Sequence, residues 1–425
     1  MIKLLMIQPE NRNINRFRRL QFNNFSQITI PYLAAYVDER FFQITLIDEY
    51  CGKIPYHRPF DLVAITVNTP NAPHCYEISR QFRQRGVKVV MGGPHATLLP
   101  EEAAQHCDHL LVGESEATWP EFLHDFQNGT AKSVYRSEQP PKLHHLPFPR
   151  WDLLKRSRTM KGAVFATRGC PYHCRYCNLK QIYHDCFRIR PVTEVVEEIR
   201  RLPSRFFVFW DDNLFADADY AKELLCVIAP LKRRWAAQAT LRDCADEELL
   251  SLAKAAGCTY LFIGLESFSQ QSLSDAGKGV NRVQDYKPLI DKIHRHGIMI
   301  QSGIVFGFDS DTKTVFDETL TACEALGIDG ATVSILTPFP KTPIHEQFKS
   351  EGRLLDTDWS KYDSKTAVAF EPKNMTARAL FDGYLRFRRQ FFSLRSFIRR
   401  TRVSKTKILS NFFINLGYRL GIRRT

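Results

Sequence analysis

Through the first 130 residues, runs of apolar and β-branched residues alternate with stretches whose apolar positions repeat at helical spacing. The pattern predicts five strands, at Ile2–Gln8, Gln43–Asp48, Leu62–Asn68, Val87–Met91 and His109–Val112. Helices are predicted to start near Pro31, Ala72, Pro100 and Thr118. Five strands with crossovers of this length suit an α/β domain with a flavodoxin-like, doubly wound sheet, whose ligands bind beyond the carboxyl ends of the strands.

A second alternation begins at Gly162 and predicts six more strands. They are expected at Ala163–Thr167, Phe206–Trp210, Ala236–Thr240, Tyr260–Gly264, Ile298–Phe306 and Ala331–Leu336. Six strands separated by helices suit a partial, open (β/α)6 barrel. Barrels of this type carry their reactive groups on the loops after the carboxyl ends of the strands, so we expect the site there.

The segment between the two alternations is rich in proline and has no hydrophobic period, which is typical of a connecting strap. We therefore predict a first domain at residues 1–128, a linker at 129–160, a barrel domain at 161–345 and a basic helical region at 346–425. A chain of 425 residues is long enough for several domains, each with its own core.

The candidate chemistry begins with three cysteines, Cys170, Cys174 and Cys177, spaced C-x3-C-x2-C on the loop after the first barrel strand. A structural zinc ion usually takes four protein ligands, and no fourth Cys or His follows at a suitable spacing. A cubane iron–sulfur cluster held by three thiolates leaves one iron open to bind another molecule. The alternatives are a zinc site that lacks a ligand, or three unrelated core cysteines.

This spacing, with the aromatic Tyr176 before the last cysteine, resembles that of the radical S-adenosylmethionine (SAM) enzymes. The runs Val90–Thr97 and Val112–Glu116 resemble the N-terminal cobalamin-binding domain of B12-dependent radical SAM proteins, over roughly residues 1–128. The resemblance implies a [4Fe-4S] cluster on the three cysteines, SAM on its open iron, and cobalamin in the first domain.

The resemblance also implies binding residues. Those for SAM are Tyr176, Asp211, Asp212, Glu266 and Ser267, and those for cobalamin are Thr69, Gly92, Gly93 and Glu114. For the two aspartates the alternative is a helix N-cap, which Asp favours. The sequence departs from the cobalamin-binding pattern in one respect. It lacks the motif Asp-x-His-x-x-Gly, whose His binds cobalt in other B12-binding folds. Asp108-His109, followed by Gly113, has the wrong spacing for this motif. Cobalamin would then bind without this His, or the domain has lost the cofactor.

Charge is concentrated at the carboxyl end. The chain has a net charge of +13, yet residues 376–425 hold thirteen Lys/Arg and one acid, a net of +12 that leaves +1 for the rest. Between Tyr384 and Arg400, Phe and Arg residues alternate at helical spacing. The simplest interpretation is a buried aromatic stripe with a solvated basic face; peripheral contact with an anionic membrane and nucleic-acid binding are the alternatives.

Eleven scattered cysteines, an odd number, argue against a disulfide framework. The first residues lack the features of a signal peptide, and no apolar run is long enough to span a membrane. We therefore expect a cytoplasmic enzyme, with membrane association through the basic region as an option.

The leading hypothesis for function is cobalamin-dependent methylation of an unactivated carbon in a small-molecule or lipid-like substrate, with a flavodoxin or ferredoxin as reductant. Radical cyclisation or oxidation is the nearest rival, and tRNA modification is a third enzymatic possibility. A non-enzymatic electron carrier or zinc-stabilised binding module is the remaining alternative.

Overall fold

The computed structural model describes residues 1–13, 27–154, 162–406 and 408–422. They form two compact units. The N-terminal unit comprises residues 1–163, 178–186 and 358–363, and the barrel unit comprises residues 164–177, 187–357 and 364–425. The described part of the predicted linker, residues 129–154, belongs to the N-terminal unit. Its last residues, 155–160, lie outside the described chain.

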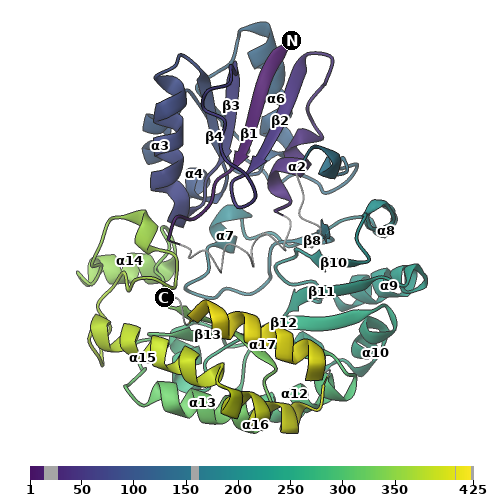
Figure 1. Ribbon diagram of the computed structural model, residues 1–425, viewed down its shortest axis with the longest axis vertical. Coiled ribbons are helices and arrows are strands. Elements are labelled where there is room, and N and C mark those ends of the chain that lie inside the picture. The colour runs from purple at the N-terminus through teal and green to yellow at the C-terminus, as the bar shows by residue number, and fades with distance from the viewer. Residues whose placement is uncertain (14–26, 155–161, 407, 423–425) are drawn as a thin grey trace. The chain divides into compact units, whose positions relative to one another are not determined.

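The N-terminal unit is built on a six-stranded sheet in the order β2-β1-β3-β4-β5-β6 (Figure 1). The strands are β1 (Ile2–Gln8), β2 (Phe42–Asp48), β3 (Leu62–Thr66), β4 (Lys88–Gly92), β5 (His109–Val112) and β6 (Val134–Arg136), and the pairs are parallel. The order of the first five is the predicted flavodoxin-like one. The sixth strand corrects the prediction, which placed residues 134–136 in the linker; three residues are too few to show a period.

Helices surround this sheet: α2 (Thr29–Ala34), α3 (Ala72–Arg83), α4 (Pro94–Leu98), α5 (Pro100–Ala103) and α6 (Ser115–Asn128). The last begins at Ser115, before the predicted Thr118, and α4 was not predicted. Alternate residues of β1 point to opposite faces. Leu5 and Ile7 join the core beneath α3, whereas Leu4 and Met6 are buried on the other face. Burial of both faces is the signature of a doubly wound sheet.

A short segment far along the chain also belongs to the N-terminal unit. In the single-turn helix Trp359–Lys361, Trp359 Nε1 donates to both carboxylate oxygens of Glu102, at 2.9 and 3.0 Å. The Ser360 carbonyl accepts a hydrogen bond from Asn13 Nδ2 at 2.6 Å. These contacts place residues 358–363 in this unit although the chain on either side lies in the other.

A second six-stranded sheet has the order β14-β13-β12-β11-β10-β7. Apart from the first two residues of β7, its strands belong to the barrel unit. Its strands are β7 (Gly162–Val164), β10 (Phe206–Phe209), β11 (Arg234–Ala239), β12 (Cys258–Glu266), β13 (Met299–Phe306) and β14 (Gly330–Ile335). The pairs from β10 to β14 are parallel and in chain order, and β7 and β14 form the two edges of this sheet. This is the predicted open barrel. The first strand is shorter than predicted, because Thr167–Arg168 leaves the sheet as β8 and pairs with β9 (Arg188–Ile189).

The helices between these strands are α8 (Val192–Arg201), α9 (Ala218–Ile228), α10 (Glu247–Ala255), α11 (Gln270–Asp275), α12 (Tyr286–Arg295) and α13 (Val315–Leu326). After the sheet come α14 (Pro343–Ser350), α15 (Ala377–Phe391), α16 (Leu394–Ser404) and α17 (Ile408–Ile422). The short helix α7 (Leu179–Ile182) belongs to the N-terminal unit.

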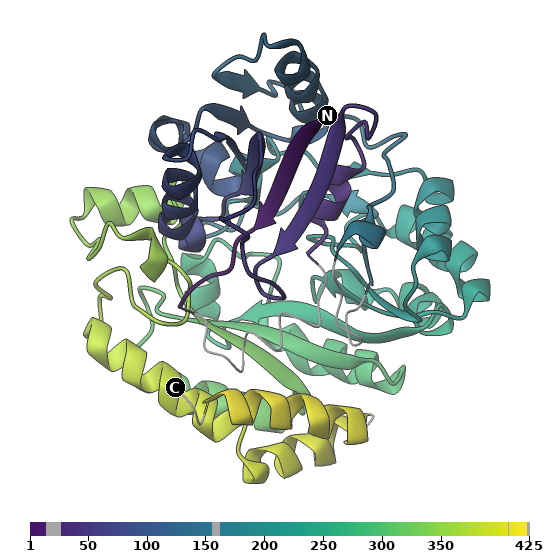
Figure 2. The same cartoon turned by 45° about the horizontal axis from the view of Figure 1, so that its top comes forward.

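The C-terminal helices α15–α17 lie along the β14 edge and α13 (Figures 1 and 2). The predicted aromatic stripe is confirmed, since Phe387, Phe391, Phe392 and Phe397 are buried. The basic face is not wholly solvated, because Arg388 and Arg400 are buried as well. No helix among the described residues is long and apolar enough to cross a membrane.

Candidate functional site

The three cysteines lie on the loop that follows β8, at the end of the first barrel strand. Their thiols form no disulfide and are partly exposed. Burial raises the pKa of Cys170 and of Cys174, and the neighbouring Cys174 raises that of Cys170 further. Thiols of this kind ionise when a metal binds them.

Among the described residues, no group of three His, Cys, Asp or Glu side chains converges to hold a single metal ion. A cubane cluster does not need such convergence, because each thiolate binds a different iron. Three thiols on one loop, none of them in a disulfide, therefore fit a cluster better than they fit zinc.

Asp211 and Asp212 fasten the chain that leads into the cysteine loop. Asp211, which follows β10 and is buried, accepts hydrogen bonds from the Ala166 amide at 3.0 Å, the Thr167 amide, and the Thr167 hydroxyl at 2.7 Å. Asp212 accepts the amide of Gly169 at 3.0 Å, immediately before Cys170. Burial raises the pKa of Asp211 to about 7 and that of Asp212 to about 6.

These contacts bear on both predictions for the two aspartates. The N-cap alternative is wrong, since α9 is capped by Asp217, whose carboxylate accepts the amide of Tyr220. The geometry favours a positioning role for Asp211, whose oxygens already accept several hydrogen bonds from the neighbouring chain. Direct contact of either aspartate with SAM stays a prediction.

Glu266 lies at the carboxyl end of β12 and forms a buried ion pair with Lys278. Lys278 Nζ lies 2.7 Å from Glu266 Oε1, and each side chain is about 10% exposed. Burial by itself would lower the pKa of Lys278, but the charge of Glu266 and then that of Cys174 keep this pKa above its usual value. Lys278 thus places a buried positive charge beside the predicted cluster ligands.

The backbone of this strand end is adapted to the pair. Glu266 has a φ of +65°, which is uncommon for a residue with a side chain, and the register with β13 shifts between Gly264 and Glu266. A Cβ atom on Gly264 would lie 2.3 Å from Glu266 Oε1 and 2.8 Å from Lys278 Nζ. Glycine at 264 therefore leaves room for the ion pair, and any larger residue would displace the ends of both side chains.

Tyr176 is placed between the cysteines and this pair. Burial raises its pKa well above the usual value, and its neighbours Glu266, Cys174 and Cys177 raise it further. The hydroxyl of Ser267 makes a local hydrogen bond: it accepts from the amide of Ser269, just before α11, at 3.1 Å. The structure brings Tyr176 and Glu266 together with the cysteine loop, and a SAM contact by Ser267 stays a prediction.

Sequence reasoning missed Lys278, Asp243 and Arg175. Lys278 stands between Gly277 and Gly279, an unusual setting for a lysine, and that was the available signal. The sequence around Asp243 carries no such signal. Asp243 joins the cysteine loop to the strand ends, because its carboxylate accepts hydrogen bonds from the Tyr172 hydroxyl at 2.9 Å and from Asn213 Nδ2 at 2.8 Å.

Arg175 ties the cysteine loop to the segments after the barrel. Its guanidinium donates to Gln347 Oε1 on α14 at 2.7 Å, and its backbone amide donates to the Ala276 carbonyl at 2.9 Å. Gln347 in turn donates to Glu351 at 2.8 Å. Arg175 and Gln347 also line a cavity of about 240 Å³.

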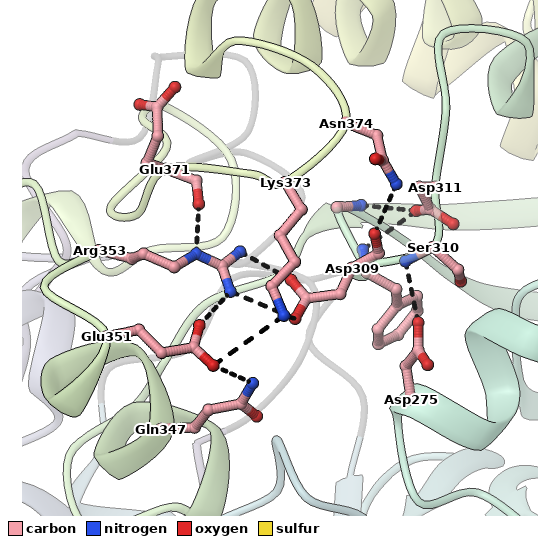
Figure 3. A network of polar contacts seen from close by, with 12 residues as sticks. Asp275, Asp309, Ser310, Asp311, Gln347, Glu351, Arg353, Glu371, Lys373 and Asn374 are labelled. Carbon is pink, nitrogen blue, oxygen red and sulfur yellow. Dashed lines mark hydrogen bonds and ion pairs between the residues drawn. The ribbon is translucent and has the colours of Figure 1, made fainter.

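Glu351 leads into a charged network around Asp309, shown in Figure 3. Arg353 donates to both oxygens of Asp309, at 2.6 and 3.2 Å, and to Glu351 at 2.7 Å, while Lys373 Nζ lies 2.9 Å from Asp309. Although burial alone would raise the pKa of Asp309, its bonds to Arg353 and Lys373 lower it. The network holds the loop after β13 against the chain that follows α14.

In the N-terminal unit, the predicted cobalamin residues gather at one edge of the sheet. Thr69 follows β3, Gly92 ends β4 and Gly93 follows it, and Glu114 follows β5. All four therefore lie at carboxyl ends of parallel strands. Thr69 and Glu114 are buried. Gly93 has a φ of +102°, and a Cβ atom there would lie 3.0 Å from Val67 N and O, so backbone conformation and close packing both favour glycine.

The histidines of this unit bear on the absent cobalt-binding motif. Asp108 and His109 lie at the amino end of β5, opposite the edge just described, and Asp108 accepts the amide of Val89 there. His95 is buried and bonded through both ring nitrogens, to Thr69 at 3.3 Å and to Tyr76 at 3.1 Å. Neither His95 nor His109 is placed to ligate cobalt from a free ring nitrogen.

Buried polar atoms that have no hydrogen-bond partner indicate whether each unit could accommodate its expected cofactor. Within the described chain these include Asn213 Oδ1 and Asn281 Oδ1 in the barrel unit, both near carboxyl ends of strands, and His74 Nδ1 in the N-terminal unit. Such atoms are stabilised by a polar ligand. With the three thiols, the pair Glu266–Lys278 and the polar sheet edge, they fit a cluster, SAM and cobalamin.

Two family models match the chain. The model of the Radical SAM superfamily matches residues 164–323, and that of the B12 binding domain matches residues 23–123. The first match contains the three cysteines, and the second contains the polar edge of the N-terminal sheet.

Relatives span most of the chain. The bacteriochlorophyllide d C-12(1)-methyltransferase of Chlorobaculum tepidum is 32% identical over 406 residues, covering 92% of this chain and 87% of the relative. An anaerobic magnesium-protoporphyrin IX monomethyl ester cyclase of Cereibacter sphaeroides is 28% identical over 371 residues, covering 78% of this chain and 60% of the relative.

The fold matches a solved structure. TsrM of Kitasatospora setae, a radical SAM methyltransferase with cobalamin and a [4Fe-4S] cluster bound, superposes with a TM-score of 0.68. The match covers 92% of this chain and 85% of TsrM at 18% sequence identity. It confirms the predicted fold class, a cobalamin-binding α/β domain followed by an open barrel.

Proposed function

Since the chain belongs to the B12-binding radical SAM family, we propose that it transfers a methyl group to an unactivated carbon atom of a small apolar substrate. The observation that carries the proposal is the 32% identity to a methyltransferase across 92% of the chain. Two further features support it: a separate cobalamin-type domain, and three thiols outside any disulfide beside a buried ion pair.

Members of this family use a [4Fe-4S] cluster, SAM and cobalamin, which supply a substrate radical and the methyl group that it receives. In our assignment, Cys170, Cys174 and Cys177 hold the cluster. Tyr176, Glu266 and Ser267 orient SAM, and Tyr176 also keeps water from the cysteine loop. Asp211 and Asp212 hold the loop that carries the thiols.

In the N-terminal unit we assign the binding of cobalamin to the polar sheet edge. Its members are Thr69, Gly92, Gly93 and Glu114. Glu114 and Thr69 supply polar groups from buried positions, and the close packing of Gly93 on the loop after β3 shapes the floor beneath them.

For the substrate, we propose a tetrapyrrole as the first class to test. Both relatives described above are named for tetrapyrrole substrates, one a methyltransferase and the other a cyclase. The electron donor is proposed to be a flavodoxin or ferredoxin, because one-electron reduction of the cluster starts the chemistry.

The test is anaerobic reconstitution with iron, sulfide and cobalamin, followed by reduction in the presence of SAM and a bacteriochlorophyllide. We expect a cluster, bound cobalamin, 5′-deoxyadenosine and a product heavier by one methylene unit. Cys174→Ala should abolish the cluster, whereas Cys226→Ala, which removes an exposed cysteine outside the loop, should retain it. A cluster without bound cobalamin would refute methyl transfer and leave radical chemistry intact.

Radical cyclisation is the second candidate, favoured by the relative of Cereibacter sphaeroides. It predicts a product that has lost hydrogen and gained no carbon. The mass of the product with a magnesium-porphyrin ester therefore separates the two reactions.

A further inference from the structure

The exposed side of α16 and α17 carries a concentration of large apolar side chains. Leu409 and Phe413 on α17 are 70% and 62% exposed. The full set, which we call the apolar face, is Leu394, Ile398, Val403, Ile408, Leu409, Phe412, Phe413 and Leu420. Eight of the large hydrophobic residues that are exposed in the described chain fall in this short stretch. Exposed apolar side chains gathered in this way are a candidate interaction surface.

The orientation of both helices is fixed by their other side, so the apolar face is not an unformed core. Buried Arg400 donates to the carbonyls of Ile328 at 2.6 Å and Asp329 at 2.9 Å, and to Asn415 Oδ1 at 2.9 Å. Asn411 Nδ2 donates to the Asp329 carboxylate at 2.9 Å. These bonds anchor α16 and α17 to the turn before β14 and leave the apolar face outward.

Positive charge accompanies the apolar face. From residue 383 to the end, the chain has twelve Lys/Arg and no Asp or Glu. Arg395, Arg402 and Lys405 are exposed on or beside α16. Arg399 is paired with Glu324 at 2.8 Å and so contributes less.

We propose that this face docks on the surface of an anionic lipid bilayer. Helices that lie in the interface bury apolar side chains at the boundary between headgroups and acyl chains, and their Lys and Arg side chains attract anionic headgroups. The combination of exposed Leu, Ile and Phe with uncompensated positive charge fits that surface. The inference does not depend on methyl transfer.

The experiment is co-sedimentation of the full-length protein with phosphatidylcholine vesicles that contain or lack phosphatidylglycerol. We expect binding to the anionic vesicles, weakened by salt and about tenfold lower for Leu409→Ser/Phe413→Ser. Arg395→Gln/Arg402→Gln/Lys405→Gln should also weaken it. Val227→Ser, which removes an exposed apolar side chain on α9, should not, and circular dichroism should show every variant folded.

Equal binding to both vesicle types, no binding, or binding unaffected by the Leu409/Phe413 variant would overturn the proposal. So would a dimer in sedimentation velocity that this variant dissolves, since the face would then bind a second copy. Binding to a short RNA duplex that the variant weakens in place of vesicle binding would assign the face to nucleic acid.

Discussion

Lys278 is the residue whose environment says most about the site. A buried ammonium is destabilising unless it is paired, and here its partner Glu266 lies 2.7 Å away, with the thiols of Cys174 and Cys177 nearby. In the proposed site, reduction would add negative charge to a cluster held by the three thiolates. A nearby buried cation stabilises the reduced form, because charge and burial set the potentials of such clusters.

We therefore expect Lys278→Met to make the midpoint potential of the reconstituted cluster more negative, by about 60 mV, a tenfold change in a one-electron equilibrium. The measurement is a redox titration followed by electron paramagnetic resonance. Lys278→Arg should retain the potential, and Lys313→Met, at an exposed position, serves as the control. An unchanged potential in Lys278→Met would show that Lys278 acts only on packing.

The raised pKa values of Asp211 and Asp212 lead us to expect that the free energy of unfolding depends on pH. Their pKa values, raised by burial from 3.8 to about 7 and about 6, mean that the folded protein holds protons more tightly than the unfolded chain. The contribution of these groups to the free energy of unfolding therefore falls as the pH rises from about 4 to about 7.

Asp212→Asn should remove part of this fall, on the order of 1–2 kcal/mol. Urea unfolding of the cluster-free protein at about pH 5 and about pH 8 measures it. Asp219→Asn on α9 is the control, because Asp219 is exposed. Identical pH dependence in wild type and Asp212→Asn would contradict the prediction.

At the scale of elements, close packing between strand ends determines the shape of the predicted cobalamin edge. Gly93 and Gly129 both have positive φ, but a Cβ atom on Gly93 would meet the backbone of Val67 at 3.0 Å, while one on Gly129 would meet nothing within 4 Å. Comparing substitutions at these two glycines therefore distinguishes the effect of backbone strain from that of steric crowding.

Gly93→Ala should lower the free energy of unfolding of the N-terminal unit by about 2–4 kcal/mol, from strain and crowding together. Gly129→Ala should lower it by about 1 kcal/mol, from strain alone. Hydrogen exchange of the β4 amides, compared between the two variants, measures the difference. Equal effects would mean that the loop after β3 yields to the added methyl group.

The predicted elements agree with the structure to within a few residues where the apolar runs are long. β1 and β5 match their predicted ends, and the other strands of the N-terminal sheet shift by one or two residues. Prediction failed for short pieces, such as β6, the five-residue α4, and the separation of β7 from β8. A period cannot be read from so few residues, and tertiary pairing decides them.

For the molecule as a whole, the C-terminal helices belong to the barrel unit and are not a separate tail. A buried network joins them to the turn before β14: Asp329 accepts bonds from His294, Thr406 and Asn411, and Arg400 binds the carbonyls of Ile328 and Asp329. Loss of one member would leave buried polar groups unpaired.

Arg400→Met should accordingly destabilise the docking of α16 and α17 by about 3 kcal/mol. Limited proteolysis should then cut between α16 and α17 much faster than in the wild type. Arg395→Met, at an exposed position on α16, should leave the rate unchanged. Equal protection in both variants would show that the aromatic contacts suffice.

The sequence by itself determined what depends on neighbours along the chain. The thiol triad lies in one run of eight residues, the alternation of strands and helices follows hydrophobic period, and the charge of the C-terminal region is a count. Folding decided which distant groups meet: Lys278 with Glu266, Asp211 with the amides before the cysteine loop, Trp359 with Glu102, and Arg400 with Asp329. A polar group is driven to pair when burial removes its water, and the sequence does not say which groups share a buried place.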